Sequence, residues 1–186
     1  MTRFWTLIFL LSALGCQPDA DPSATVKSDR IYRDLQAEMA RHNSFPFDFR
    51  LPSIDGDIIS KADFQGQVLI VDIWGTWCPP CRKEIPHFIQ LRNTYGKEEL
   101  AIVGLNYERV NEAQTAINKI KSFRDVNGIN YPCLLGDDET AKQIPNFQGF
   151  PTTFFIDKQG EIRLTLVGLQ PYKRLEAAAQ ILLQEP

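Results

Sequence analysis

The sequence predicts an α/β protein in which a mixed β-sheet is covered on both faces. Short apolar runs rich in β-branched residues, typical of buried strands, alternate with amphipathic stretches at helical spacing. Their order is strand, helix, strand, helix, followed by a strand hairpin and a last helix, which favours a mixed sheet. The chain has 186 residues, enough for one domain with extensions.

The composition excludes several classes of protein. Lys and Arg number 20 against 23 Asp and Glu, so the net charge is −3, whereas a nucleic-acid-binding protein needs a basic face. With 44% hydrophobic and 23% charged residues, the chain is neither disordered nor collagen-like. Four cysteines are too few for a disulfide scaffold, so we expect them to carry local chemistry.

Residues 1–15 are typical of a secretory signal peptide. After a basic start, the uncharged run Phe4 to Gly15 would rise about 18 Å as a helix, short of the roughly 30 Å hydrocarbon core. Residues 11–16, Leu-Ser-Ala-Leu-Gly-Cys, resemble the lipobox of bacterial lipoproteins, which implies acylation of Cys16 and a membrane anchor. The alternatives are an uncleaved anchor and an ordinary signal peptide with an incidental cysteine. All of them carry the folded part across the membrane.

Residues 16–44 are predicted to be a tether and a short helix. Residues 17–28 hold two prolines and almost no large apolar side chain, which is typical of a flexible tether. A helix over 31–41 follows, with apolar residues every four positions and Asp29 placed to cap it. The pattern fits both a helix packed on the domain and a spacer.

The domain, residues 45–186, opens with a predicted N-terminal β-hairpin. Phe47 to Leu51 alternates apolar and polar residues, and turn-forming residues at 53–57 separate it from a second short strand, Ile58–Ile59.

The remaining elements follow from their apolar patterns. Continuous β-branched runs predict buried strands, and apolar residues three and four apart predict helices. Asn127-Gly128 is placed to end the second helix, and residues 157–160 form the turn between the last two strands. The predicted strands are Val68–Ile73, Leu100–Leu105, Tyr131–Leu135, Thr152–Ile156 and Ile162–Val167. The predicted helices are Cys81–Tyr95, Ala113–Asn127, Thr140–Ile144 and Tyr172–Leu183.

The motif Cys78-Pro-Pro-Cys81 has three interpretations. A zinc site needs a second pair of ligands, yet only Cys133, His42 and His87 remain and none is in paired spacing, so we expect no metal site. We expect Cys133 to be a buried free thiol and both histidines to be surface or rim residues. A structural disulfide this short would remove little entropy from the unfolded chain.

The third interpretation, a redox dithiol, is favoured by its position. The motif lies where the strand over 68–73 meets a helix, so Cys78 faces the unpaired N–H groups and partial positive charge of the helix start. That field favours the thiolate and lowers the Cys78 pKa below the free value of ~8.5, toward ~7. Cys81, inside the first turn, is expected to be the shielded, resolving thiol.

Residues 71–86, Val-Asp-Ile-Trp-Gly-Thr-Trp-Cys-Pro-Pro-Cys-Arg-Lys-Glu-Ile-Pro, resemble the thioredoxin superfamily. The context Trp74-Gly-Thr-Trp77 is similar to its TlpA/ResA-like branch of membrane-tethered, extracytoplasmic thiol–disulfide oxidoreductases. Residues 149–154, Gly-Phe-Pro-Thr-Thr-Phe, resemble the cis-proline segment of that family. The resemblance covers residues 45–183 and implies a thioredoxin-like fold.

The resemblance also implies contacts with substrate. Pro151 is expected to follow a cis peptide bond, with the backbone of Phe150 as a docking edge for an extended substrate. Trp77 and Pro79 are expected beside it. An ordinary trans proline at the start of a strand is the alternative interpretation of Pro151.

Two carboxylates are candidate acid–base groups. Asp72 interrupts an apolar strand, where a charge costs several kcal/mol unless it is paired or protonated. The matching position in thioredoxins serves the resolving cysteine, although the TlpA/ResA-like branch more often has asparagine there. Glu84, three residues after Cys81, matches a glutamate of the family near the dithiol. The alternative is a solvated glutamate stabilised by the helix dipole.

The pair Pro79-Pro80 removes two N–H donors that could otherwise reach the Cys78 sulfur. We therefore expect a reducing couple, nearer ~−270 mV than ~−120 mV on the scale of thioredoxin and DsbA.

The sequence thus predicts a membrane-tethered, extracytoplasmic reductase of protein disulfides, with cytochrome c maturation or other metalloprotein thiol reduction as its setting. Its only redox group would be the Cys78–Cys81 disulfide, without a cofactor, and by family analogy a membrane dithiol would donate electrons. One alternative is a peroxidase of peroxiredoxin type, but the Pro-x-x-x-Thr-x-x-Cys pattern of that group is missing. Another is a non-catalytic copper metallochaperone.

Overall fold

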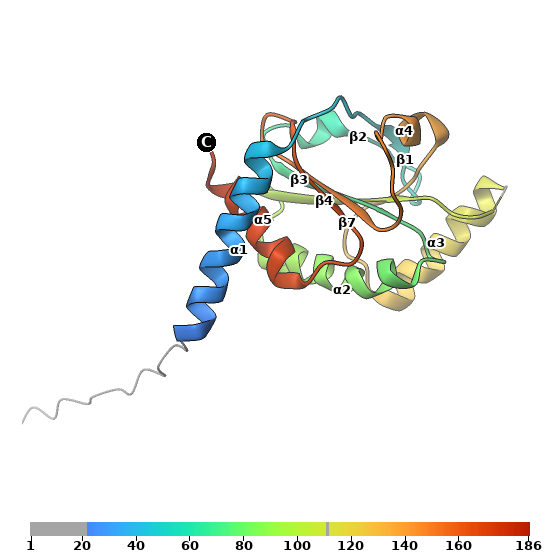
Figure 1. The fold of residues 1–186 in the computed structure, drawn as a ribbon. Coiled ribbons are helices and arrows are strands. Elements are labelled where there is room, and N and C mark those ends of the chain that lie inside the picture. Colours follow the sequence, from blue (N-terminus) through green and yellow to red (C-terminus); the bar gives the residue numbers. More distant parts are fainter. Residues whose placement is uncertain (1–21, 111) are drawn as a thin grey trace, which may run out of the picture.

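A computed structural model describes residues 22–110 and 112–186 of the protein. A five-stranded mixed sheet forms its centre (Figure 1). In spatial order the strands are β5 (Cys133–Leu135), β4 (Leu100–Asn106), β3 (Val68–Trp74), β6 (Thr152–Ile156) and β7 (Ile162–Val167). β3 and β5 run parallel to β4, whereas β6 is antiparallel to both β3 and β7. The predicted mixed sheet is confirmed.

Alternating side chains of β3 divide the core into two apolar clusters. Val68, Ile70 and Trp74 face the cluster that contains side chains of the four long helices, of which α2 (Pro79–Thr94) lies below the sheet in Figure 1. Leu69 and Ile73 face the second cluster, together with aromatic side chains from residues 45–49. The long helices are α1 (Pro22–Arg41), α2 (Pro79–Thr94), α3 (Ala113–Asn127) and α5 (Tyr172–Gln184). The sheet is therefore covered on both faces, as predicted.

The predicted N-terminal hairpin is present as a separate two-stranded sheet. Its strands pair antiparallel, with Leu51 opposite Ile59. Ser53, which follows the first strand, forms an isolated bridge to Leu134 and so joins the hairpin to the edge of the central sheet. The short elements are β1 (Arg50–Pro52), β2 (Ile58–Ser60), the 3₁₀ helix η1 (Lys61–Phe64) and α4 (Asp138–Lys142).

α1 differs from the prediction, because it begins at Pro22 rather than near Ile31. A flexible tether over 17–28 is therefore wrong for residues 22–28. A proline is tolerated in the first turn of a helix, where its missing N–H group has no intrahelical partner anyway. Leu35 and Met39 are buried in the core, so this helix packs on the domain and is not a free spacer.

The predicted signal peptide, residues 1–15, and Cys16 lie outside the described residues. Within the described part of the chain, no helix is long and apolar enough to cross a membrane.

Candidate active site

The dithiol lies at the start of α2, directly after the carboxyl end of β3. Cys78 is the N-cap residue, Pro79 and Pro80 are the first two helical residues, and the backbone N–H of Cys81 donates to the Cys78 Sγ at 3.2 Å. The two cysteines form a disulfide. The sulfur of Cys78 thus accepts a hydrogen bond from one of the helix-start N–H groups that have no intrahelical partner.

Aromatic side chains lie on one side of the cluster that contains the disulfide. Trp77 packs edge-to-face on Phe150, with ring centroids 5.1 Å apart, and Phe147 also packs edge-to-face on Phe150, at 5.0 Å. The Phe150–Pro151 peptide bond is cis, as the resemblance implies. Trp77 and Phe150 are half-buried against the same apolar cluster that holds the disulfide. The structure therefore brings together Trp77 and Phe150, two of the four residues that the sequence predicted for substrate contact.

Both cysteines are buried in the oxidised protein, Cys78 being 2% exposed and Cys81 1% exposed. Burial alone therefore does not distinguish an attacking from a resolving sulfur, and the two differ in position, Cys78 at the N-cap and Cys81 in the first turn. Pro79 is exposed, whereas Pro151 is buried.

Asp72 lies on β3 and points to the same face as Ile70 and Trp74, the face that α2 covers. It is 1% exposed, and its Oδ1 atom has no hydrogen-bond partner. Burial raises the pKa of Asp72 well above its usual range, and the nearby carboxyl of Glu84 raises it further. Asp72 therefore holds a proton more tightly than an ordinary carboxyl.

Glu84 is also buried, so the interpretation as a solvated glutamate is wrong. Its Oε1 atom accepts a hydrogen bond from the backbone N–H of Gln170 at 2.6 Å, while Oε2 has no partner. Burial raises the pKa of Glu84 to about 7, and the hydrogen bond from Gln170 acts in the opposite direction. Two buried carboxyls with raised pKa values thus lie close enough to interact.

The remaining predicted residues are placed as expected. His42 is half-buried, with Nε2 3.0 Å from the Thr165 hydroxyl, and Nδ1 of His87 lies 3.1 Å from the Gln170 carbonyl. Cys133 is a buried free thiol whose pKa is raised to about 12, chiefly by burial. Residues 22–110 and 112–186 contain no group of three His, Cys, Asp or Glu side chains that could hold a metal ion.

Sequence reasoning missed three consecutive residues beside the dithiol, Tyr107 to Arg109. The Trp77 indole N–H donates to the Tyr107 carbonyl at 2.9 Å, and the Thr76 backbone N–H donates to the Glu108 Oε1 atom at 2.8 Å. The signal was available, because these residues follow β4, and the carboxyl ends of neighbouring parallel strands meet at one edge of a sheet.

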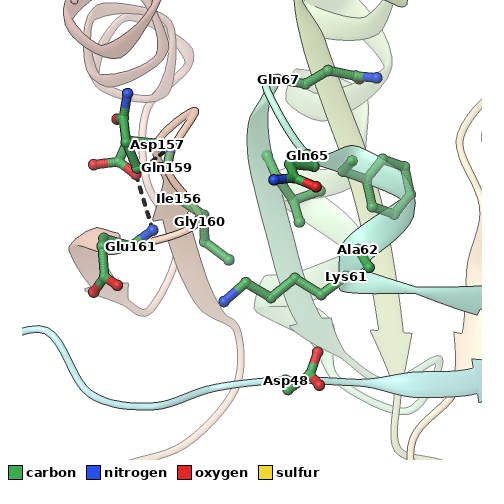
Figure 2. Close-up of a pocket in the computed structure, with 12 residues that line it drawn as sticks. Asp48, Lys61, Ala62, Gln65, Gln67, Ile156, Asp157, Gln159, Gly160 and Glu161 are labelled. Carbon is green, nitrogen blue, oxygen red and sulfur yellow. Dashed lines mark hydrogen bonds between the residues drawn. The ribbon is translucent and has the colours of Figure 1, made fainter.

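A hollow of about 320 Å³, drawn in Figure 2, is lined in part by Leu69 and Ile156. These two residues pair at the end of β3 opposite to the dithiol. Two of the charged side chains that line the hollow have partners within the fold. Asp157 accepts hydrogen bonds from the backbone N–H groups of Gln159 and Glu161, and Lys61 donates to the Phe47 carbonyl. It contains no cysteine, so the dithiol is the candidate active site.

A central mixed sheet, a Cys-Pro-Pro-Cys disulfide at a helix start and a cis-proline directly after Phe150, which packs on Trp77, together define a thioredoxin-like redox protein. Comparison with known proteins agrees. The sequence pattern of the AhpC/TSA family matches residues 43–165, and the chain belongs to this family.

Individual relatives indicate which kind of thioredoxin-like protein the chain resembles. The chain is 31% identical over 188 residues to the thiol:disulfide interchange protein DsbE of Pseudomonas aeruginosa, covering 96% of this chain and 89% of the relative. It is 30% identical over 129 residues to the thiol-disulfide oxidoreductase ResA of Geobacillus kaustophilus, covering 69% and 71%. A crystal structure of a thioredoxin-family thiol:disulfide interchange protein from Chlorobium tepidum matches with a TM-score of 0.65 and 28% identity, covering 76% and 98%. The protein is a thiol–disulfide oxidoreductase of this type.

Proposed function

We propose that the protein reduces disulfide bonds of client proteins outside the cytoplasm. The observation that carries this proposal is the placement of Cys78 as the N-cap of α2, in a fold that also buries the carboxyls of Asp72 on β3 and Glu84 on α2. The Cys78 thiolate attacks one sulfur of a client disulfide, forming a mixed disulfide and releasing the other client sulfur as a thiolate. Cys81 then attacks Cys78, the client leaves fully reduced, and the Cys78–Cys81 disulfide forms. Two electrons pass from the dithiol to the client.

Asp72 and Glu84 are the proposed acid–base groups for Cys81. The resolving step requires Cys81 to lose its proton, because only the thiolate is a nucleophile. A carboxylate whose pKa is raised toward that of a thiol accepts this proton more readily than an ordinary carboxylate does. Asp72 is the principal base in this proposal, and Glu84 assists it.

The proposed client surface is the group of apolar side chains near the cis-proline, Pro151. Five large apolar side chains of the described residues are exposed. Three of these belong to this region: Phe147 comes three residues before Phe150, Val167 is the last residue of β7, and Leu169 follows that strand. Exposed apolar groups that gather at one place are typical of a binding surface. An extended client segment would lie along the backbone at Phe150, with Trp77 and Pro79 on its other side.

The proposed cellular setting follows from the N-terminal sequence. We propose that residues 1–15 are removed, that acylated Cys16 anchors the protein to the membrane, and that a membrane dithiol restores the reduced state. Apocytochrome c, or another metalloprotein whose thiols must be reduced, is the proposed client. The disulfide itself is the only redox group in this proposal.

Trapping with cysteine variants tests the function. Cys81→Ala should accumulate mixed disulfides with clients, because the intermediate cannot be resolved, and Cys78→Ala should accumulate none. Equal trapping by both variants would contradict the proposed order of attack. Rapid consumption of hydrogen peroxide by the reduced protein would favour a peroxidase instead, and tight copper binding with slow disulfide exchange would favour a metallochaperone.

A further inference from the structure

Three consecutive residues, Tyr107 to Arg109, contact the segment 74–77 that leads to Cys78, and we call them the 107–109 brace. The Tyr107 backbone N–H donates to the Trp74 carbonyl at 2.9 Å, and its carbonyl accepts from the Trp77 indole at 2.9 Å. The guanidinium carbon of Arg109 lies 3.4 Å from the centroid of the Trp77 ring. The brace therefore contacts both ends of the segment 74–77.

Glu108, in the middle of the brace, contacts the backbone of the turn that leads to Cys78. Its Oε1 atom accepts from the Thr76 backbone N–H at 2.8 Å, and its Oε2 atom pairs with the Lys119 ammonium on α3 at 2.7 Å. The Glu108 side chain is 1% exposed, whereas that of Lys119 is 44% exposed. Burial opposes ionisation of Glu108, but the hydrogen bonds from Lys119 and Thr76 outweigh it and lower its pKa.

Thr76 lies within a tight turn that ends at the nucleophile. The Cys78 backbone N–H donates to the Gly75 carbonyl at 3.1 Å, which closes the turn, and Thr76 is its second residue. The ionised Glu108 carboxylate is hydrogen-bonded two residues before Cys78. A lone negative charge at that place would disfavour a thiolate on Cys78, and the Lys119 ammonium counters it.

We propose that Glu108 is a positioning residue for Cys78, fixing the turn through the Thr76 amide, while Lys119 neutralises its charge so that thiolate formation is not opposed. The inference rests on the proposed function in taking Cys78 as the attacking sulfur. It assigns a role to the conformation of the turn and to the charge balance beside it.

The test is the pH dependence of Cys78 alkylation by iodoacetamide in the reduced full-length protein, read by mass spectrometry. Lys119→Gln should raise the Cys78 pKa by about 0.5 to 1 unit, slowing alkylation about three- to tenfold at a pH below that pKa. Glu108→Gln keeps an acceptor for Thr76 but leaves the ammonium unbalanced, so it should shift the pKa in the opposite direction. Glu185→Gln is the matched control, because its carboxylate pairs with Arg163 near the opposite end of the sheet.

Shifts of opposite sign support the proposal, because a purely structural ion pair would affect both variants alike. If Cys78 of the wild-type protein is reactive and the two variants shift its pKa in the same direction, or not at all, the proposal is overturned. Failure of the proposed function looks different, since wild-type Cys78 would then not reduce a client disulfide at all.

Amide hydrogen exchange tests the positioning directly. Glu108→Ala should speed exchange of the Thr76 amide at least about tenfold, and Glu108→Gln should preserve its protection. Unchanged exchange in Glu108→Ala would overturn the positioning role. If Glu108→Ala does not fold, the half-exposed Lys119→Gln still decides the charge balance.

Discussion

Because burial raises the pKa of Glu84, this residue makes the free energy of unfolding of the oxidised protein depend on pH. The unfolded chain releases the Glu84 proton near pH 4.5, whereas the folded protein holds it until about pH 7. Between these values the folded state binds more protons, so the free energy of unfolding falls as the pH rises. The difference between these two pKa values, about 2.5, corresponds to a loss of about 3 kcal/mol in the free energy of unfolding once the pH exceeds 7.

Glu84→Gln removes the titration and keeps an amide oxygen that can accept from the Gln170 N–H. Most of the loss falls between pH 5 and pH 8. Over that range the wild type should lose about 2.5 kcal/mol more unfolding free energy than Glu84→Gln. The assay is urea unfolding of both oxidised proteins at a series of pH values. Titrating groups that do not interact with Glu84, such as His42, are present in both proteins and cancel in the difference.

Parallel stability curves for the two proteins would refute this reasoning. They would mean that Glu84 titrates at its ordinary pKa, which requires that it be hydrated in the folded protein. A steeper loss in Glu84→Gln than in the wild type would have the wrong sign and would be equally decisive.

Other predictions concern the mechanism, the client surface and the fold. Asp72→Asn should slow the resolving step about 10²-fold, seen as a longer-lived mixed disulfide with Cys81 intact, and an unchanged lifetime would contradict a proton-accepting role. Phe150→Ala should lower kcat/KM for protein disulfides several-fold while leaving reduction of a small disulfide nearly unchanged; equal losses would argue against client docking there. A glutathione redox titration should give a midpoint nearer ~−270 mV than ~−120 mV, because Pro79 and Pro80 offer no N–H donors to the sulfur. Leu35→Ala should cost about 2 to 5 kcal/mol of unfolding free energy, because this α1 side chain is buried; a cost near zero would mean that α1 is not docked in solution.

The fold could be predicted from local patterns because its core is regular. The β3 and β4 strands are mostly apolar runs buried on both faces, and their length and β-branched composition identify them. The position of Cys78 was equally predictable, since the change from strand to helix falls at the motif itself. The burial of Asp72 followed from its place within such a strand.

Contacts between segments distant in sequence could not be read in the same way. The burial of Glu84 depends on Gln170, which is 86 residues away and closes over the carboxyl from the loop before α5. The role of Glu108 depends on Thr76 and on Lys119, from two different elements. The early start of α1 was missed because the polar, proline-containing sequence around Pro22 matches a tether as well as a helix start.

The thiolate pKa of wild-type Cys78 tests the account most directly, because every proposed step begins with that sulfur at the start of α2. Alkylation of the reduced protein, followed across pH and resolved by residue, should give a half-point near ~7 for Cys78. A half-point at or above ~8.5, the value of a free cysteine, would show that the helix start does not activate this sulfur and would contradict the account.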